Sequence, residues 1–480
     1  MTETTQHTSE RMAVVNPATR EVVDEVRDMT VPELDAAVRR AHAAFPSWRT
    51  TPADQRAAVL VAAAGLMRER RDELARTLTL ESGKPLADSA GEIEVAAQFL
   101  AWNAEEGRRT YGRTIPSPFA DRRYLTVAQP VGVVGAITPW NFPASMVTRK
   151  AGAALAAGCT VVLRPADATP LIALAIRDIL AEAGLPEHVL EVVTNSDAPA
   201  VGRLLTQHPL VAKITFTGST AVGAALCEQA APGLKRVSME LGGHAPFLVF
   251  PDADLDLVAN AVVASRYRNG GQSCISTNRL VMHSTVAAKV LDDLVDRVST
   301  LVVGDGMSPE TQIGPLIDDR AAERLSGLQQ DATAKGARVL TGGELVHPGG
   351  LPGAFYRPTV LTDIPDGADI LTTETFGPVL SVLTFDTDDE ALRIANSTSY
   401  GLAAYAFTTD LSRAMHVAEA LDFGVVGVND PAPSAPCLPF GGVKMSGLGR
   451  ENGSDGVLAF TETKAISLGI GLPAGAGRKG

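Results

Sequence analysis

The sequence predicts an α/β protein whose main unit is a doubly wound parallel sheet, followed by a second α/β unit and a small β flap. Two apolar, β-branched runs at 131–137 and 160–163 are typical of buried parallel strands, and the Ala-rich stretch 147–157 between them is helical in composition. A helix between two strands supplies the crossover that parallel pairing requires. With 480 residues, the chain is long enough for two large domains.

The same alternation continues on both sides of these strands. Upstream, Thr51 is a suitable capping residue, Pro52 suits the first helical position, and apolar residues follow at helical spacing, so the N-terminal part is expected to be rich in helices. Downstream, the pattern predicts a helix closed by glycine, two strands and the start of another helix, at 170–184, 189–193, 211–216 and 218–230. This order is that of a doubly wound sheet.

A second unit is expected after a boundary near 243–253, where Gly242, Gly243 and Pro251 interrupt the pattern. The strands predicted in it include 245–250, 279–283 and 381–385. Two other segments alternate polar and apolar residues, as half-exposed strands do, and we expect them to pair as a flap, 122–129 with 458–470. The expected domains are therefore 1–121 with 131–243, then 244–445, and a flap with a C-terminal tail made of 122–130 and 446–480.

The composition limits the kind of partner. Asp and Glu number 55 against 42 Lys and Arg, a net charge of −13, which argues against a nucleic-acid partner or an anionic membrane surface. There is no run of 18 apolar residues, and the first ten residues lack a basic start and an apolar segment. We expect no membrane span and a cytoplasmic location.

The four cysteines, Cys159, Cys227, Cys274 and Cys437, are far apart and form no C-x-x-C pair. This spacing disfavours both a disulfide framework and a structural metal site, so no metal is expected. Any cysteine with a special role must therefore act as a free thiol.

Cys274 ends the segment "NGGQSC", in which two glycines loosen the backbone before the thiol. Most free cysteines are small buried hydrophobes, so this segment alone is weak evidence for a nucleophile. Two other segments strengthen it, because "TPWNFP" and "MELGG" also follow predicted strands, where doubly wound sheets bind ligands. They supply an amide at Asn141 and a carboxylate at Glu240. Similarly, "FTGSTAVG" puts Gly218 and Gly223 at a strand-to-helix junction that is suited to phosphate, although a tight turn is the more common explanation of such a pattern taken alone.

Six segments in the same order resemble the signature segments of the aldehyde dehydrogenase superfamily: "TPWNFP", "FTGST", "MELGGHAP", "NGGQSC", "ETFGP" and "PFGGVKMSGLGRE". The resemblance extends over nearly the whole chain. It implies a Rossmann-like NAD-binding domain for the first unit, a catalytic domain for the second, and an oligomerisation flap that makes a homodimer or homotetramer.

The resemblance also implies a mechanism. The Cys274 thiolate attacks an aldehyde, hydride leaves to the nicotinamide, and a thioester remains. An ordinary thiol has a pKa of about 8.5, so we expect a site that favours the anion. Asn141 and the Cys274 backbone N–H would form the oxyanion hole, and Glu240 would activate water for thioester hydrolysis. Lys150 and Glu451 match a pair that relays protons in many members.

The expected cofactor is NAD, with NADP possible. The resemblance places the dinucleotide against Thr138, Pro139, Trp140, Gly218, Ser219, Gly223, Glu374 and Phe376. Arg164 and Asp167 match the segment that holds the adenosine ribose. A carboxylate at Asp167 would repel a 2′-phosphate and favour NAD, whereas Arg164 would attract one.

Within the superfamily, "TRKAGAALAAGCTVV" and "RNGGQSC" are most similar to succinate-semialdehyde dehydrogenases. That similarity implies a small aldehyde bearing a carboxylate, held by Arg149, Arg268 and Ser434, because guanidinium groups and a hydroxyl bind and orient an anion. The proline-rich stretch 429–442 differs from that branch and is compatible with a longer or aromatic aldehyde. Ser276 occupies a position where some members have a second redox cysteine.

Two other classes of function remain open. Cys274 with a histidine would make a hydrolase, and His244, four residues after Glu240, is the candidate partner, although we expect it to be a structural or channel residue. A non-catalytic NAD-binding homologue is the other class. Such proteins often lose the nucleophile or the base, whereas this chain has both Cys274 and Glu240.

Overall fold

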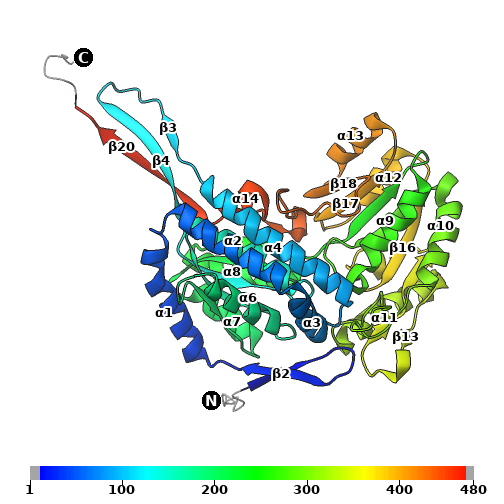
Figure 1. Cartoon of the computed structure of the whole chain (residues 1–480). Coiled ribbons are helices and arrows are strands. Elements are labelled where there is room, and N and C mark those ends of the chain that lie inside the picture. Colours follow the sequence, from blue (N-terminus) through cyan, green and yellow to red (C-terminus); the bar gives the residue numbers. More distant parts are fainter. Residues whose placement is uncertain (1–10, 472–480) are drawn as a thin grey trace, which may run out of the picture.

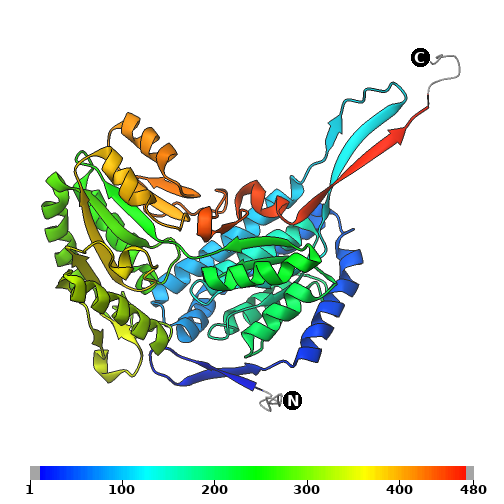
Figure 2. The ribbon, with the colours of Figure 1, turned by 180° about the vertical axis from the view of Figure 1, so that it is seen from behind.

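The computed structural model describes residues 11–471, which form two α/β bodies side by side and a flap that projects from the first body (Figure 1). The two ends of the chain, 1–10 and 472–480, lie outside the described residues, and so does most of the predicted C-terminal tail. Figure 2 shows the same arrangement from behind, with the last strand running outward along the flap. None of the helices within 11–471 combines the length and the apolar character needed to cross a membrane.

The first body is built on a six-stranded sheet in the order β19-β9-β8-β5-β6-β7, in which all neighbours except the β19–β9 pair are parallel. The chain moves outward from β5 to β7 and then crosses to β8 and β9, so the sheet is doubly wound and the direction of winding changes between β5 and β8. The strands are β5 Val133–Ile137, β6 Thr160–Arg164, β7 Leu190–Val192, β8 Val211–Thr217, β9 Arg236–Glu240 and β19 Gly447–Leu448.

Helices cover both faces of this sheet. One face carries the larger hydrophobic core, packed under α2 Ala53–Glu69, α3 Arg71–Ser82, α4 Leu86–Arg108, α5 Pro143–Ala157 and α6 Leu171–Glu182. The other face packs against α1 Val31–Trp48, α7 Ala198–Gln207 and α8 Thr220–Ala230. Helix α5 ends at Gly158, whose φ of 94° lies in the left-handed region that favours glycine. All of α5 is buried, which places its polar side chains inside the protein.

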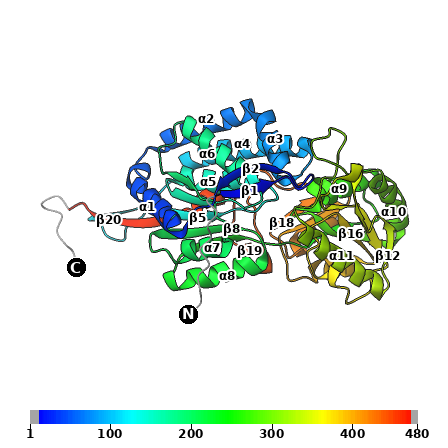
Figure 3. The same cartoon turned by 90° about the horizontal axis from the view of Figure 1, so that it is seen from below.

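The second body contains a seven-stranded sheet in the order β12-β15-β16-β11-β10-β17-β18, parallel except at β12. Its strands are β10 Ala245–Val249, β11 Thr277–His283, β12 Arg338–Thr341, β15 Thr359–Thr362, β16 Val379–Phe385, β17 Ala403–Phe407 and β18 Val425–Val428. The helices beside it are α9 Leu255–Tyr267, α10 Ser284–Ser299, α11 Asp319–Lys335, α12 Asp388–Asn396 and α13 Leu411–Ala420. The view from below shows the two bodies next to each other (Figure 3).

The flap is a three-stranded antiparallel sheet of β3 Arg113–Ile115, β4 Arg122–Pro130 and β20 Thr461–Gly469, in the order β20-β4-β3. The predicted pairing of 122–129 with the last strand is confirmed, with Thr461 opposite Pro130 and Gly469 opposite Arg122. The expected start of the flap at 446 differs from the structure, because β19 joins the six-stranded sheet beside β9 and α14 Gly453–Leu458 packs on α4 and α5.

The doubly wound α/β class is confirmed, and so are the strands predicted near 131, 160, 211, 245, 279 and 381. The helix expected from Thr51 begins at Ala53, with Pro52 as its N-cap. The sequence analysis did not find the hairpin of β1 Arg11–Val15 and β2 Val22–Arg27, whose residues are mostly exposed and whose alternation is short.

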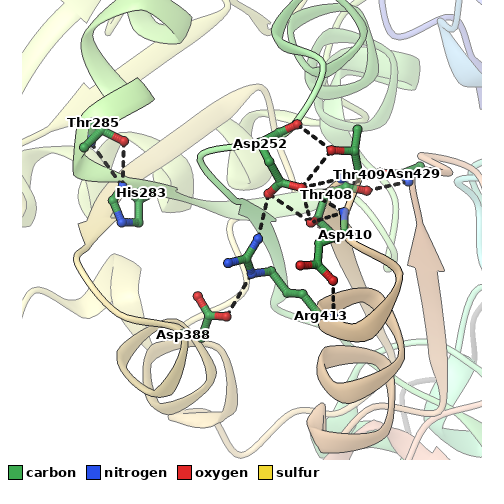
Figure 4. A network of polar contacts seen from close by, with 9 residues as sticks. All are labelled: Asp252, His283, Thr285, Asp388, Thr408, Thr409, Asp410, Arg413 and Asn429. Carbon is green, nitrogen blue, oxygen red and sulfur yellow. Dashed lines mark hydrogen bonds and ion pairs between the residues drawn. The ribbon is translucent and has the colours of Figure 1, made fainter.

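At the carboxyl end of the second sheet, a hydrogen-bond network centred on Asp252 connects the turns that follow β10, β17 and β18 (Figure 4). Its carboxylate accepts hydrogen bonds from the hydroxyls of Thr408 and Thr409 and forms an ion pair with Arg413 at 2.8 Å. These hydrogen bonds outweigh desolvation and hold the pKa of Asp252 below its usual value. Thr408 in turn pairs through its backbone with the side chain of Asn429, the first residue of the proline-rich stretch. The network therefore anchors the start of that stretch to the sheet.

Candidate active site

The candidate site lies where the carboxyl ends of β5, β8 and β9 in the first sheet meet the amino ends of β11 and β16 in the second. Asn141 follows β5, Glu240 is the last residue of β9, and Cys274 precedes β11. Glu374 precedes β16 and accepts the backbone N–H of Gly243 at 3.0 Å. The short connection 241–244 thus joins the two sheets within the site.

The turn that carries Cys274 depends on left-handed backbone conformations and close approaches. Asn269, Gly270 and Gly271 all have positive φ, at 52°, 62° and 71°. A Cβ on Gly271 would lie 2.5 Å from the carbonyl oxygen of Gly377. A Cβ on Gly243 would lie 2.2 Å from the carbonyl oxygen of Cys274, so only glycine allows the two backbones to approach this closely.

Cys274 opens into a cavity of about 240 Å³. The three expected carboxylate-binding residues, Arg149, Arg268 and Ser434, line the same cavity although they come from different parts of the chain. Apolar side chains form much of the remaining wall, including Val95, Phe99, Phe142, Met146, Ile275 and Phe440. A half-buried thiol and two arginines around one small cavity suit a short aldehyde with an anionic end.

The cavity does not favour a thiolate in the way the sequence analysis expected. Burial raises the pKa of the Cys274 thiol to about 12, and the carboxylates of Glu374 and Glu240 add to the rise, while Arg149 lowers it. A low-dielectric cavity with two nearby carboxylates disfavours a further negative charge, so the expected preference for the anion stays a prediction. Thiolate formation therefore becomes more favourable as pH rises.

Glu240 is buried, and neither of its carboxylate oxygens has a hydrogen-bond partner among the described residues. Burial raises its pKa well above the ordinary value, and the charge of Glu451 adds to this effect. Lys150 forms a buried ion pair with Glu451, and its Nζ also donates to the Thr215 hydroxyl at 3.2 Å. A carboxylate with a raised pKa is a stronger base once ionised.

The Asn141 side chain is held on the nucleophile turn. Its Nδ2 donates one hydrogen bond to the backbone carbonyl of Gln272 at 3.0 Å, two residues before Cys274. An amide nitrogen carries two hydrogens, so a second N–H is available for an oxygen atom next to the thiol.

The two cavity arginines differ in how firmly they are held. Arg149 is buried between the rings of Phe99 and Phe440, with its Cζ 4.7 and 4.6 Å from the ring centroids. Its Nη2 donates to the Ser434 hydroxyl at 3.5 Å, and its Nη1 lies 3.8 Å from Glu451 Oε2. Arg268 is exposed at the cavity and lies 5.5 Å from the Phe142 ring centroid.

The residues expected at a dinucleotide gather where the winding direction changes. Thr138, Pro139 and Trp140 follow β5, and Gly218 and Ser219 follow β8, with Gly223 in the first turn of α8. The Ser219 hydroxyl accepts the N–H of Val222, so α8 begins at this edge and its positive end faces the site.

Two buried hydroxyls at this edge, those of Thr138 and Thr217, have no hydrogen-bond partner among the described residues. Together with the helix N-terminus they form a neutral donor set that fits an anionic diphosphate. Glu374 lies close to the connection between the two sheets, since a Cβ on Gly242 would lie 2.9 Å from its Oε2. Burial raises the pKa of Glu374 to about 7. The rings of Phe376 and Trp140 meet edge to face at 5.5 Å.

Arg164 and Asp167 form an ion pair with each other. The sequence analysis had treated them as opposing influences on the adenosine ribose. Burial raises the pKa of Asp167, and the charge of Arg164 counteracts that rise. The guanidinium and the carboxylate thus offset each other, and a ligand would meet the pair rather than either charge alone.

His244 is fully buried, with Nε2 3.1 Å from the carbonyl oxygen of Ile370 and its ring stacked on Tyr400. Burial lowers its pKa to about 3, which makes it neutral at physiological pH. Among the described residues that line the cavity of Cys274 there is no histidine. This packing agrees with the structural role expected for His244 and gives no support to a cysteine–histidine hydrolase.

Sequence analysis missed several residues that hold the site together. Lys84 and Glu92 form a buried ion pair beside Asn141. Arg266 donates to the hydroxyls of Ser276 and Thr375, so it links the nucleophile turn to the segment of Glu374. The hydroxyl of Tyr405 donates to the Ile275 carbonyl at 2.6 Å. Most of their contacts join residues far apart in the sequence, and their only local signal was the turn "SGKP", which lies between α3 and α4.

Two parallel-stranded bodies, a thiol between them and a donor set that fits a diphosphate make up an α/β protein with a candidate site between its two sheets. The family model "Aldehyde dehydrogenase family" matches residues 4–466, and the chain therefore belongs to the aldehyde dehydrogenase family.

Relatives of known name are similar over almost their whole length. The chain is 48% identical to succinate-semialdehyde dehydrogenase [NADP(+)] GabD of Escherichia coli K12, over 96% of this chain and 95% of that one. It is 46% identical to a glutarate-semialdehyde dehydrogenase of Pseudomonas putida KT2440, over 95% and 94%. The crystal structure of an E. coli NADP-dependent enzyme superposes with a TM-score of 0.94 at 47% identity, covering 96% and 95% of the two chains.

We predict that Gly243→Ala disables the site. A Cβ there must push the Cys274 carbonyl away, and a displacement of about 1 Å at a reacting group can cost about 100-fold in rate. The turnover number, kcat, measured from the absorbance of NADH, should therefore fall by about that factor. Gly65→Ala is the control, because nothing lies within 4 Å of a Cβ at Gly65, and its kcat should be unchanged. Wild-type kcat in folded Gly243→Ala would contradict the importance of this contact.

Proposed function

We propose that the protein oxidises succinate semialdehyde to succinate with NAD(P), through a thioester on Cys274. The observation that carries this proposal is the single cavity that holds Cys274 together with Arg149, Arg268 and Ser434. The expected substrate class was a small aldehyde with a carboxylate. The relatives named for succinate and glutarate semialdehydes act on aldehydes of that kind.

In the first half of the reaction, Cys274 loses its proton and its sulfur forms a bond to the aldehyde carbon. The second N–H of the Asn141 amide and the Cys274 backbone N–H then bind the oxygen that becomes negative, a type of contact worth about 3–4 kcal/mol per donor. A nicotinamide bound beside Phe376 and Trp140 would supply the acceptor for the hydride that leaves this carbon. A thioester on Cys274 remains.

In the second half, Glu240 takes a proton from water, and the resulting hydroxide attacks the thioester carbon. The C–S bond breaks, the carboxylate product leaves, and Cys274 is free again. Glu240 must be ionised for this step, and Lys150 and Arg149 favour the ionised form. The Lys150–Glu451 pair beside Glu240 then passes the proton away from the site.

The cofactor lies along the edge where the winding of the first sheet changes. In this proposal, Gly218, Ser219 and the start of α8 bind the diphosphate, with Gly223 allowing close packing at that turn. Glu374 would hold the nicotinamide ribose, and Phe376 and Trp140 would pack beside the ring. Residues 1–121 and 131–243 then form the dinucleotide-binding domain and 244–445 the catalytic domain. Thr138 and Pro139 complete the wall along the dinucleotide.

The flap, 122–130 with the strand at the end of 446–480, makes the subunit contact of a homodimer or homotetramer. Within residues 11–471, strands β20 and β3 each leave one edge unpaired, and such an edge can accept a strand from another subunit. A cytoplasmic location remains a prediction.

We predict that Arg268→Ala selectively impairs the oxidation of succinate semialdehyde. A hydrogen bond to a charged group contributes about 1.5–3 kcal/mol, so kcat/KM for this substrate should fall about 10- to 100-fold. Butanal has the same chain length without the carboxylate, and its kcat/KM should change little. Steady-state kinetics with both aldehydes measure the difference.

Arg149→Ala should show the same preference with an added loss for butanal, because Glu451 then loses a neighbouring positive charge. An equal fall for both substrates in Arg268→Ala would rule out the carboxylate-binding role. Wild-type protein that oxidised butanal or benzaldehyde as efficiently as succinate semialdehyde would favour the alternative, a dehydrogenase for a longer or aromatic aldehyde.

On the cofactor, we predict a higher kcat/KM with NAD than with NADP, because the ion pair with Asp167 keeps the Arg164 guanidinium from binding a 2′-phosphate. Asp167→Ser should free Arg164 and raise kcat/KM with NADP by about tenfold. The double variant Arg164→Met/Asp167→Ser is the control and should lose that gain. A wild-type preference for NADP, as in the name of the E. coli relative, would contradict the role of Asp167.

A further inference from the structure

Lys84 lies in the turn between α3 and α4, and this turn is wedged between the two bodies. Gly83 has a φ of 76°, and a Cβ on it would lie 2.7 Å from the ring of Pro315. On the other side, a Cβ on Gly306 would lie 2.4 Å from the Lys84 carbonyl oxygen. Leu86 donates its N–H to the Gly306 carbonyl at 2.9 Å. The turn is therefore fixed by backbone contacts with the second body.

The Lys84 side chain is buried, with a relative exposure of 2%, and forms an ion pair with Glu92, which is 1% exposed. Its Nζ also donates to the backbone carbonyl of Asn141 at 2.8 Å and lies 4.3 Å from the Phe142 ring centroid. The same Asn141 carbonyl accepts a second hydrogen bond, from Asn269 Nδ2 at 2.9 Å. Two buried donors thus fix the peptide of Asn141.

Glu92 holds the next residues of the same segment. Its Oε1 accepts the backbone N–H groups of Ala144 and Ser145 at 2.9 and 3.1 Å. These are at the start of α5, the helix that carries Arg149 and Lys150. A carboxylate at a helix N-terminus satisfies N–H groups that have no partner within the helix.

We propose that Lys84 and Glu92 are positioning residues, which clamp residues 141–145 so that the Asn141 amide faces Cys274. This inference rests on the proposed role of Asn141 as an oxyanion donor. The two ends of the clamp are complementary, since Lys84 binds the carbonyl of Asn141 and Glu92 binds the amides that follow. The Asn141 side chain reaches the carbonyl of Gln272 from this fixed backbone.

Stability alone does not account for such a pair. Desolvation of two charges costs about as much as their attraction returns, and apolar or neutral replacements of buried ion pairs are often equally stable. A role in positioning does account for the buried pair, because an oxyanion donor is effective only when its position relative to the developing charge is correct to within about a few tenths of an ångström.

The test is a double-mutant cycle between the clamp and Asn141. Lys84→Met/Glu92→Gln removes both charges and the donor to Asn141, while the side-chain oxygen that remains at position 92 can still accept the N–H groups of α5. The rate constant of hydride transfer, measured in a single turnover with succinate semialdehyde and NAD, should fall about 10- to 100-fold. In an Asn141→Ala background the same two changes should alter it by less than about threefold.

Glu81→Gln is the matched control. Glu81 is equally buried on the same helical hairpin and accepts the N–H groups of Leu171 and Ile172 at the start of α6, which carries no residue of the site. The rate constant of hydride transfer in the Glu81→Gln variant should stay within about threefold of wild type. NAD affinity, measured by fluorescence quenching, should stay within the same range in all these variants, because the clamp does not contact the dinucleotide edge.

Three outcomes separate the hypotheses. An equal fall in the wild-type and Asn141→Ala backgrounds, or no fall in either, would overturn the positioning role. If Asn141→Ala alone left the rate unchanged, the proposed role of Asn141 would fail instead. Should Lys84→Met/Glu92→Gln not fold, Lys84→Gln in the same cycle keeps a shorter amide donor, and it should show a smaller loss that again disappears without Asn141.

Discussion

The backbone of Gly243, in the connection from β9 of the first sheet to β10 of the second, lies close to the Cys274 carbonyl, and the rest of the site depends on this approach. Glu240 ends a strand of the first sheet and Cys274 precedes a strand of the second, so the thiol and the base come from different bodies. The missing side chain at Gly243 lets them approach, and the N–H of the same residue holds Glu374 at 3.0 Å. One glycine therefore couples the nucleophile, the base and the expected ribose carboxylate. A site assembled in this way is sensitive to any shift between the bodies, which explains the dense buried hydrogen bonds of Lys84, Asn269 and Arg266 around it.

The electrostatics of the site follow from the same enclosure. Burial raises the pKa values of Cys274, Glu240 and Glu374, because each negative charge loses water, and the two carboxylates raise the pKa of Cys274 further. Arg149 and Lys150, adjacent on α5, supply the opposing positive charge, and Glu451 interacts with both. Glu240 adds to the rise in the thiol pKa, so neutralising Glu240 does not hinder thiolate formation. In the proposed reaction the two halves would therefore have separable requirements, a thiolate for acylation and an ionised Glu240 for hydrolysis.

The sequence predicted the parts of this site that depend on local pattern. Strand and helix alternation identified the doubly wound sheet, and the ordered segments around Asn141, Glu240 and Cys274 identified the family before the fold was known. The general rule that ligands bind at carboxyl ends of parallel strands applied to β5, β8 and β9, but not to the second sheet, which contributes its amino ends. The sequence pattern could not predict which side chains would contact each other when they lie far apart in the chain. The Arg164–Asp167 pairing was not anticipated, the raised thiol pKa depends on burial that only the fold reveals, and Lys84 meets Asn141 across 57 residues.

The central claim is that Cys274 carries the substrate as a thioester that Glu240 releases, and rapid mixing of Glu240→Gln with succinate semialdehyde and NAD tests it most directly. The account predicts a burst of one equivalent of NADH per site, followed by a stall, with a succinyl group on the Cys274 peptide found by mass spectrometry. Cys274→Ala should give neither the burst nor the adduct. NADH formation without an acyl group on Cys274, or steady turnover of Glu240→Gln at the wild-type rate, would contradict it.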